Sequence, residues 1–197
     1  MTTSTTYTYD AVSNRTSKTV NGVVKNYNYN NLNQLTSETG ISYKYDLNGN
    51  RTKKIDGART TTYTYDAFNR LSRATIQKGT KVAVEEYKYD WQGNRIRKSK
   101  ESNVVKYLVD TNNWISHVVA ETDGANVLKA FYTRGGDSLI NMNRGGVKSY
   151  YLFDGHGSVR MLANEANSIT DTWNFDAYGE ITFRTGDRKS TRLNSSH

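Results

Sequence analysis

Three residues of the types that form hydrolase triads lie close together in the sequence: Asp154, His156 and Ser158. A triad needs an acid, a base and a nucleophile that converge from different parts of a fold. Side chains two positions apart on a strand instead splay along it, and Gly155 and Gly157 indicate a turn. The G-x-S-x-G nucleophile elbow does not occur in the sequence. We therefore assign no catalytic residue and expect a protein that is not an enzyme.

Metal binding has equally little support. The sequence has three histidines and no cysteine, whereas zinc sites cluster Cys, His and carboxylate ligands. His117 stands in an apolar, strand-like segment, which favours a packed histidine over a metal ligand. Calcium loops place several carboxylates in one short stretch, but the candidate turns described below carry one Asp each. We expect no metal and no other cofactor.

The composition indicates a sheet rich in tyrosine. The chain has 15 tyrosines, no proline and a mean hydropathy of −0.81. So polar a chain has little aliphatic surface to bury, but each buried ring removes roughly 150–250 Å² from water. A sheet whose tyrosines pack ring on ring reconciles these properties. The sequence has no signal-peptide pattern at its start and no apolar run of the ~18 residues that a membrane span requires.

An internal repeat dominates the sequence. A Tyr-x-Tyr pair recurs, an acidic or amide residue follows it, and Asn-Arg comes shortly afterwards in most copies. The tyrosine pairs are Tyr7/Tyr9, Tyr27/Tyr29, Tyr43/Tyr45, Tyr63/Tyr65 and Tyr87/Tyr89. The residues that follow them are Asp10, Asn30, Asp46, Asp66 and Asp90. The Asn-Arg pairs are Asn14-Arg15, Asn50-Arg51 (after Gly49), Asn69-Arg70 and Asn94-Arg95 (after Gly93), and the second copy has Asn33-Gln34 instead.

Each copy of this repeat predicts a β-hairpin. Tyrosines two positions apart share one face of a strand, and threonine and tyrosine suit a pleated, half-buried surface. The Asp ends the strand because its carboxylate can accept a hydrogen bond from the backbone two residues later. Asn or Gly then tolerates the positive φ that closes the turn. The fold class that follows is all-β, built of consecutive antiparallel hairpins.

The spacing from the turn acid to the arginine takes two values. Asp46 and Arg51 are five positions apart, whereas Asp66 and Arg70 are four positions apart. A one-residue change reverses which side chains face inward. We therefore predict two turn geometries that alternate along the chain. Each arginine could cover a tyrosine face or pair with the turn Asp, and the sequence leaves both options open.

The repeat weakens after Asp90, where the strands become more apolar and glycine turns separate them. We expect repeat hairpins over residues 1–106 and a C-terminal part of the same sheet over residues 107–186. Residues 187–197 read DRKSTRLNSSH, which resembles a translated sequencing adapter. We therefore expect a non-native tail here and a natural protein that continues differently after Gly186.

Two types of motif carry a family resemblance, and each type is found in two stretches. Residues 43–51 (YKYDLNGNR) and 87–95 (YKYDWQGNR) are similar to the Y-x-Y-D-x-x-G-N-R hairpins of the RHS/YD-repeat family. Residues 150–160 resemble the Y-Y-x-x-D-x-x-G-S-V-R signature near the end of the RHS core, and residues 173–180 resemble the Y-D-x-x-G-E that follows it. The matching positions are Tyr151, Asp154, Gly157, Ser158, Val159, Arg160, Asp176, Gly179 and Glu180.

The resemblance, which covers about residues 7–184, implies a strip of sheet that spirals into a hollow shell. Family members include bacterial polymorphic toxins, toxin-complex components and animal teneurins, and in the bacterial toxins the shell encloses a C-terminal toxin. The implied location is secreted or at the bacterial cell surface. The implied partners are the rest of the same shell and a toxin cargo, with secretion-system components and surface glycans as further candidates. The family's Asp-Pro cleavage site has no counterpart, because this sequence has no proline.

The charge and the many tyrosines raise two other function classes. The formal charge of +8 invites a nucleic-acid reading. However, the lysines are dispersed and the tyrosines recur at structural positions, so we expect no nucleic-acid partner. The alternative function that we keep is a carbohydrate-binding or cell-surface adhesion module, in which exposed rings would stack on sugars.

Overall fold

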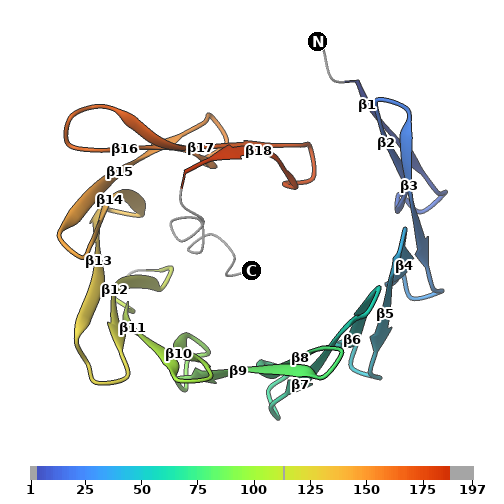
Figure 1. The fold of residues 1–197 in the computed structure, drawn as a ribbon, viewed down its shortest axis with the longest axis horizontal. Helices are drawn as coiled ribbons and strands as arrows, with labels where there is room; N and C mark the ends of the chain where they lie inside the picture. The colour runs from blue at the N-terminus through green and yellow to red at the C-terminus, as the bar shows by residue number, and fades with distance from the viewer. Residues whose placement is uncertain (1–3, 113, 187–197) are drawn as a thin grey trace. The chain divides into compact units, whose positions relative to one another are not determined.

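The computed structural model describes residues 4–112 and 114–186. These residues form eighteen β-strands and no helix (Figure 1). Each ladder joins a strand to the next one in the chain, and all are antiparallel. The expected all-β class with consecutive antiparallel hairpins is therefore confirmed. The described residues contain no helix that could cross a membrane. The suspected foreign tail, residues 187–197, lies outside the described residues.

The chain divides into two compact units, with the boundary between Val104 and Val105. The strands of unit 1 are β1 (Thr5–Tyr9), β2 (Arg15–Val20), β3 (Val23–Tyr29), β4 (Leu35–Glu38), β5 (Ile41–Tyr45), β6 (Arg51–Asp56), β7 (Arg59–Tyr65), β8 (Leu71–Lys78), β9 (Lys81–Tyr89) and β10 (Arg95–Lys100). Those of unit 2 are β11 (Asn103–Asp110), which starts just before the boundary, β12 (His117–Asp123), β13 (Leu128–Gly135), β14 (Ser138–Arg144), β15 (Val147–Phe153), β16 (Val159–Ala163), β17 (Ile169–Phe175) and β18 (Ile181–Thr185). The division into repeat hairpins over 1–106 and a core part over 107–186 stays a prediction.

A β-bulge follows every repeated turn of unit 1. In the β7–β8 hairpin, Thr64 pairs with Arg73 and Tyr65 with Leu71, so Ser72 is the extra residue. The bulged position is Thr16, Thr36, Thr52, Ser72 and Ile96 in the five hairpins. A hydroxyl suits this position because it can satisfy the opposite strand, as Ser72 Oγ does by donating to the Thr64 carbonyl at 3.0 Å.

Unit 1 buries little apolar surface. Among its described residues, the buried apolar side chains are Tyr27 and Ala74, while Lys18, Thr61 and Ser99 are buried polar ones. A single layer of sheet without a second layer explains this pattern, because each strand then has few positions shielded from water. The low mean hydropathy of the chain is thus compatible with an ordered fold.

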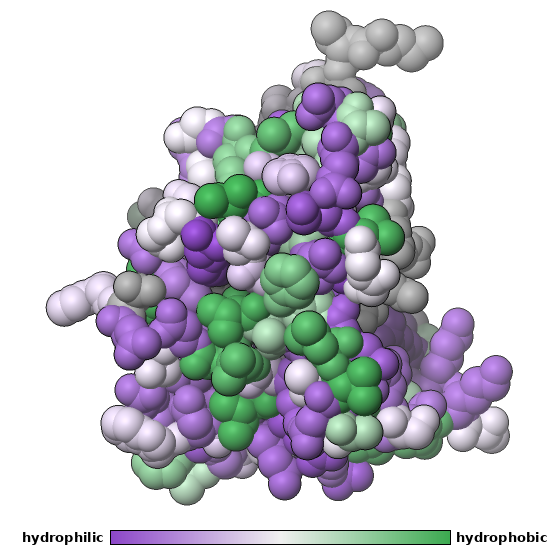
Figure 2. All heavy atoms as spheres, turned by 90° about the vertical axis from the view of Figure 1, so that its left-hand side faces the viewer, coloured by the Kyte–Doolittle hydropathy of each residue, from purple (hydrophilic) through white to green (hydrophobic). Residues whose placement is uncertain are grey.

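Unit 2 has a larger apolar core. Its buried cluster comprises Ala130, Tyr132, Met142, Tyr151, Val159, Leu162 and Trp173, with Val118, Leu139 and Phe175 packed against it. Strands β13 to β17 supply the fully buried members. Other apolar side chains of the same strands remain exposed, among them Phe131, Leu152 and Met161. Figure 2, which faces the side of the molecule where β13 to β15 lie, shows hydrophobic residues gathered near the middle of that face.

Candidate functional site in the repeated turns

One turn geometry recurs at nine places among the described residues. The N–H of the first residue donates to the carbonyl of the fifth, and the N–H of the fourth donates to the carbonyl of the first. The fourth residue always has a positive φ, between 58° and 90°. These turns begin at Asp10, Asn30, Asp46, Asp66, Asp90, Asp123, Asp154, Asn164 and Asp176. The uniform geometry makes the turn the structural unit of the repeat.

The first residue of the turn caps the backbone. Asp46 Oδ1 accepts hydrogen bonds from the N–H groups of Asn48 (3.0 Å) and Asn50 (2.8 Å). Its Oδ2 accepts from Asn50 Nδ2 at 3.2 Å. The same arrangement lowers the pKa of Asp10, chiefly through the hydrogen bond from the Asn14 side chain. The carboxylate is therefore occupied within its own turn.

Both spacings of the sequence share this geometry, so the prediction of two alternating turn types is wrong. Asn69, with φ of 58°, takes the fourth position, which Gly49 holds in the preceding YD turn with φ of 83°. Arg70 then takes the fifth position, where Asn50 stands, and its Nε donates to Asp66 Oδ2 at 2.8 Å. The Asn-Arg letters of this copy therefore lie one position earlier in an unchanged turn. Asn can occupy either the fourth or the fifth position of the turn. The spacing from Asn-Arg to the turn acid therefore does not reveal the turn geometry.

The arginines lie over tyrosine rings. Arg15 Cζ is 5.8 Å from the ring centre of Tyr7 in its own hairpin and 4.2 Å from that of Tyr27 in the next hairpin. Arg51 bridges the first tyrosines of its own and the next hairpin in the same way, at 5.2 and 5.4 Å. Where we expected ring-on-ring packing, a guanidinium lies between the two rings. The contact is a cation–π interaction.

From the second copy of the repeat onward, the second tyrosine of each pair reaches back to the preceding hairpin. Its hydroxyl donates to the carbonyl of the first residue in that hairpin's second strand, at 2.8 to 3.1 Å. The donor–acceptor pairs are Tyr29 and Arg15, Tyr45 and Leu35, Tyr65 and Arg51, and Tyr89 and Leu71. Burial raises the pKa of Tyr29, Tyr65 and Tyr89. The two tyrosines thus link hairpins by different means, one through a ring face and one through a hydroxyl.

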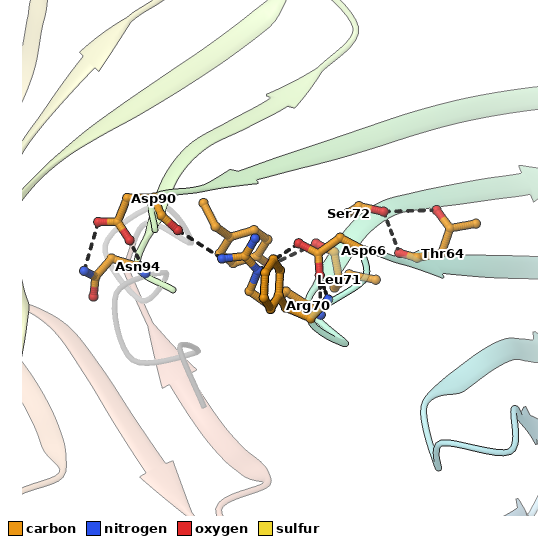
Figure 3. A network of polar contacts seen from close by, with 9 residues as sticks. Thr64, Asp66, Arg70, Leu71, Ser72, Asp90 and Asn94 are labelled. Carbon is orange, nitrogen blue, oxygen red and sulfur yellow. Dashed lines mark hydrogen bonds and ion pairs between the residues drawn. The ribbon is translucent and has the colours of Figure 1, made fainter. Parts of the chain in front are cut away.

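Arg70 combines both options that the sequence left open (Figure 3). It pairs with Asp66 in its own turn, and its Nη1 donates to the Asp90 carbonyl of the next turn at 3.0 Å. Its Cζ also lies 4.9 Å from the ring centre of Tyr89. One side chain therefore joins two successive turns and covers an aromatic ring.

The core-signature residues of unit 2 form two more of these turns. Asp154 Oδ1 accepts from the Ser158 N–H at 3.0 Å, and Gly157 supplies the positive φ of 78°. Asp176, Gly179 and Glu180 occupy the same positions in the turn before β18, where the Glu180 N–H donates to Asp176 Oδ1 at 2.9 Å. Tyr151 and Val159 point into the buried cluster, and burial raises the pKa of Tyr151 to about 12. Arg160 lies over Phe175, 5.6 Å from the ring centre.

The triad-type residues line a cleft of about 1040 Å³ in unit 2. Asp154 uses its Oδ1 to accept the backbone N–H groups of His156 and Ser158, both at 3.0 Å. It therefore caps the turn on which the other two side chains stand. His117 also lines this cleft, is 9% exposed, and places its Nε2 3.1 Å from Asp137 Oδ1. No cluster of three potential metal ligands occurs within residues 4–112 and 114–186.

Two features of unit 2 were missed by sequence reasoning. Asn164 begins a turn whose N-x-x-N pattern matches the second repeat copy, so this signal was present in the sequence. Glu121 accepts from the Tyr132 hydroxyl at 2.8 Å and from Arg144 Nη2 at 3.0 Å. These three residues come from three strands and have no shared sequence pattern, so only the fold reveals them.

Comparison with known proteins identifies a family with a matching sequence model. The model of the teneurin YD-shell family matches residues 2–187. A comparison with curated protein sequences gives no match.

Three solved structures with a similar course of the chain have low identity to it. TcdB2-TccC3-TEV has a TM-score of 0.44 and 12% identity over 92% of this chain and 13% of that chain. The Tc holotoxin pore of Photorhabdus luminescens with the mutation TccC3-D651A has a TM-score of 0.42 and 13% identity, over 95% of this chain and 14% of that chain. TcdB2-TccC3 without its hypervariable C-terminal region has a TM-score of 0.42 and 14% identity, over 95% of this chain and 14% of that chain. The chain thus spans about one seventh of the length of these structures.

Proposed function

Because the chain belongs to the teneurin YD-shell family, we propose that it is a non-catalytic wall segment of a larger shell protein. The observation that carries this proposal is the repeated link between hairpins: a tyrosine hydroxyl on a backbone carbonyl and an arginine between two rings. Such links depend only on the neighbouring hairpin, as in other repeat proteins. A wall of any length can therefore be built by adding copies.

The finer proposal is that the complete wall encloses a C-terminal toxin, and that the protein acts outside the bacterial cell. The partners would then be the remaining shell and this cargo. Membership in a shell family supports an enclosing wall, and the resemblance to RHS toxins in residues 150–160 and 173–180 is what suggests a toxin cargo. Secretion-system components and surface glycans are not required by it.

The contacts of the tyrosine rings support glycan binding less well than they support a wall segment. Stacking on a sugar needs an open ring face, whereas Arg15 covers the Tyr27 ring at 4.2 Å and Tyr27 is only 4% exposed. An arginine also lies over the first tyrosine of the third and fifth copies. We therefore do not propose the carbohydrate-binding or adhesion function.

The test uses the complete gene product that contains this segment. Tyr29, Tyr65 and Tyr89 are changed together to Phe, which removes three hydroxyl links between hairpins. Limited proteolysis, followed by mass spectrometry, should release fragments of any downstream domain faster in the variant than in the parent protein. A downstream domain that is digested equally fast in both proteins would contradict the enclosing role. A matched variant, Tyr27→Phe, removes a hydroxyl that has no hydrogen-bond partner within residues 4–112 and 114–186, and it should leave the digestion unchanged.

A further inference from the structure

The middle residue of each Tyr-x-Tyr pair projects from the side of the sheet opposite the rings. Residues that pair directly on antiparallel strands share a face, so the cross-strand partner of the middle residue lies on the same side. In unit 1 there is one such pair in each hairpin, always at the same position relative to the turn. The five pairs are Thr8/Ser17, Asn28/Ser37, Lys44/Lys53, Thr64/Arg73 and Lys88/Arg97.

The side chains at this position change from neutral to cationic along unit 1. In the first hairpin, Thr8 Oγ1 lies within hydrogen-bond distance of Ser17 Oγ, at 2.6 Å. In the second hairpin, Asn28 Nδ2 donates to Ser37 Oγ at 2.9 Å. The next three hairpins have five cations at this position. We call this set the cation row, which consists of Lys44, Lys53, Arg73, Lys88 and Arg97.

The repeated turn does not require cations at this position. Each of the four repeated turns of unit 2 has an equivalent cross-strand pair, and none of these pairs includes lysine or arginine. They are Glu121/Ala130, Leu152/Met161, Leu162/Asp171 and Asn174/Phe183. Among the nine described turns of this geometry, cations therefore stand at this position in three consecutive hairpins only.

Most cations of the row face each other without an acid between them. Lys44 pairs directly with Lys53, and Lys88 pairs directly with Arg97. Like charges directly opposite each other destabilise a sheet. Among the described residues, no carboxylate lies within 4.0 Å of these four side chains. Since the first two hairpins show that a neutral pair serves the fold, an anionic partner explains the row better than hairpin stability does.

The cation row is open to solvent. Lys44 and Lys88 are exposed, and so is Thr62, which pairs with Lys53 on the same face. The Arg73 side chain is 50% exposed and lies 4.0 Å from an acid of the next strand. From β5 to β10 there are five strand spacings of ~4.8 Å, so the row is roughly 24 Å long. The sheet thus gathers cations that are dispersed in the sequence.

The row belongs to the strongly basic part of the chain. Residues 1–104 have 17 lysines and arginines against 9 aspartates and glutamates, whereas residues 105–186 have 7 against 9. Several acids of unit 1 are also occupied as turn caps, as Asp46 and Asp90 are. The excess of positive charge therefore lies in unit 1, which has the row on one face.

The face that carries the row suits a planar anionic surface. From β5 to β10, the directly paired residues on this face include no aromatic side chain. Protein interfaces are centred on aromatic and apolar groups and contain few lysines, and single-stranded nucleic acids stack their bases on rings. The face lacks these features. All five cations leave one side of a single sheet, and long lysine stems can adjust the position of their charged ends. A plane of anionic groups can therefore meet them together.

We propose that the cation row binds the surface of an anionic lipid membrane, without insertion into it. Each Lys or Arg near such a surface strengthens binding roughly fivefold, which corresponds to about 1 kcal/mol. The choice of a membrane over duplex nucleic acid rests on the extracellular wall function proposed above, because a wall that acts outside the cell meets lipid surfaces there.

Vesicle binding of the whole chain tests the proposal. The chain should co-sediment with vesicles of phosphatidylcholine and phosphatidylserine but not with vesicles of phosphatidylcholine alone, and raising the ionic strength should release it. The double change Lys88→Gln and Arg97→Gln should weaken the binding roughly 25-fold. Urea unfolding of this variant should show an unchanged or higher midpoint, because the change removes a pair of like charges.

The matched control is Lys78→Gln together with Lys81→Gln. These lysines also pair directly and are exposed, but they lie on the tyrosine side of the sheet. Their distance from the membrane and screening by salt should limit the loss of binding to about threefold.

The proposal would be overturned by equal losses in the two double variants, or by binding to phosphatidylcholine alone. No binding to anionic vesicles at low ionic strength, with or without binding to duplex DNA, would also overturn it. A lower urea midpoint of the Lys88→Gln and Arg97→Gln variant would assign these cations to the fold instead. The proteolysis test of the enclosing wall does not depend on any of these results, so the two proposals can fail separately.

Discussion

The fourth residue of each turn adopts a positive φ that a side chain with a Cβ disfavours. In the turn that starts at Asp154, Gly157 has a φ of 78°, whereas Gly155 lies outside this region and both have open space around them. We expect Gly157→Ala to lower the free energy of unfolding by roughly 1–2 kcal/mol. Gly155→Ala should be neutral or slightly stabilising, since it restricts the unfolded chain. Urea unfolding of both variants tests this, and equal midpoints would refute it.

Two neighbouring tyrosines of β3 provide a second test at the residue scale. The Tyr29 hydroxyl donates to the Arg15 carbonyl at 3.1 Å, whereas the buried Tyr27 hydroxyl has no hydrogen-bond partner among the described residues. Tyr29→Phe should therefore cost about 1 kcal/mol of unfolding free energy, and Tyr27→Phe should cost nothing or be stabilising. Chemical denaturation followed by circular dichroism measures both. A larger loss for Tyr27→Phe would show that the hydroxyls have the opposite roles.

At the scale of the element, the capped turn predicts sensitivity to acid. The pKa values of Asp10, Asp90 and Asp154 are lowered in the folded chain, so these groups stabilise it fully above their unfolded pKa of about 3.9. This stabilisation is lost as the pH falls through the lowered folded values. Unfolding free energy should stay level from pH 7 to about 5 and fall below about pH 4. Asp90→Asn, which cannot ionise, should flatten this decline. A stability that rises on acidification would be inconsistent with the capping role.

The hairpins themselves could be predicted from the sequence, but the links between successive hairpins could not. Period-two tyrosines and a following Asp are local signals, and every Tyr-x-Tyr pair lies at the end of a strand as expected. The links between hairpins join residues 10 to 18 positions apart, such as Tyr45 with Leu35 and Tyr89 with Leu71, and in each the acceptor is a backbone carbonyl. Every residue has a backbone carbonyl, so the residue types in the sequence do not indicate which carbonyl accepts the hydrogen bond. The shift of Arg70 into the fifth turn position was hidden for the related reason that Asn69 suits two positions.

At the scale of the whole molecule, the two units differ in where their stability resides. Unit 1 repeats the same local links along ten strands and has few buried apolar side chains. Unit 2 has a contiguous cluster around Leu162, Trp173 and Met142. In a repeat structure, each repeat and each interface adds a small share of the unfolding free energy, so the loss of one link has a small effect. In a structure with one buried cluster, the unfolding free energy depends on a few residues. The more apolar strands after Asp90 indicate part of this contrast, but the sequence does not show that side chains from β13 to β17 form one cluster.

Hydrogen exchange in a core variant tests this contrast. Leu162 is 1% exposed, so Leu162→Ala should cost about 2–5 kcal/mol through lost burial and a cavity. Amide protection should fall in peptides from β15 to β17 and remain unchanged in peptides from β5 to β8, because the links of unit 1 involve only neighbouring hairpins. Leu47→Ala, at a fully exposed tip, should leave protection in unit 2 unchanged. Uniform loss of protection along the chain after Leu162→Ala would instead mean that both units unfold as one cooperative body, and that stability is not divided in this way.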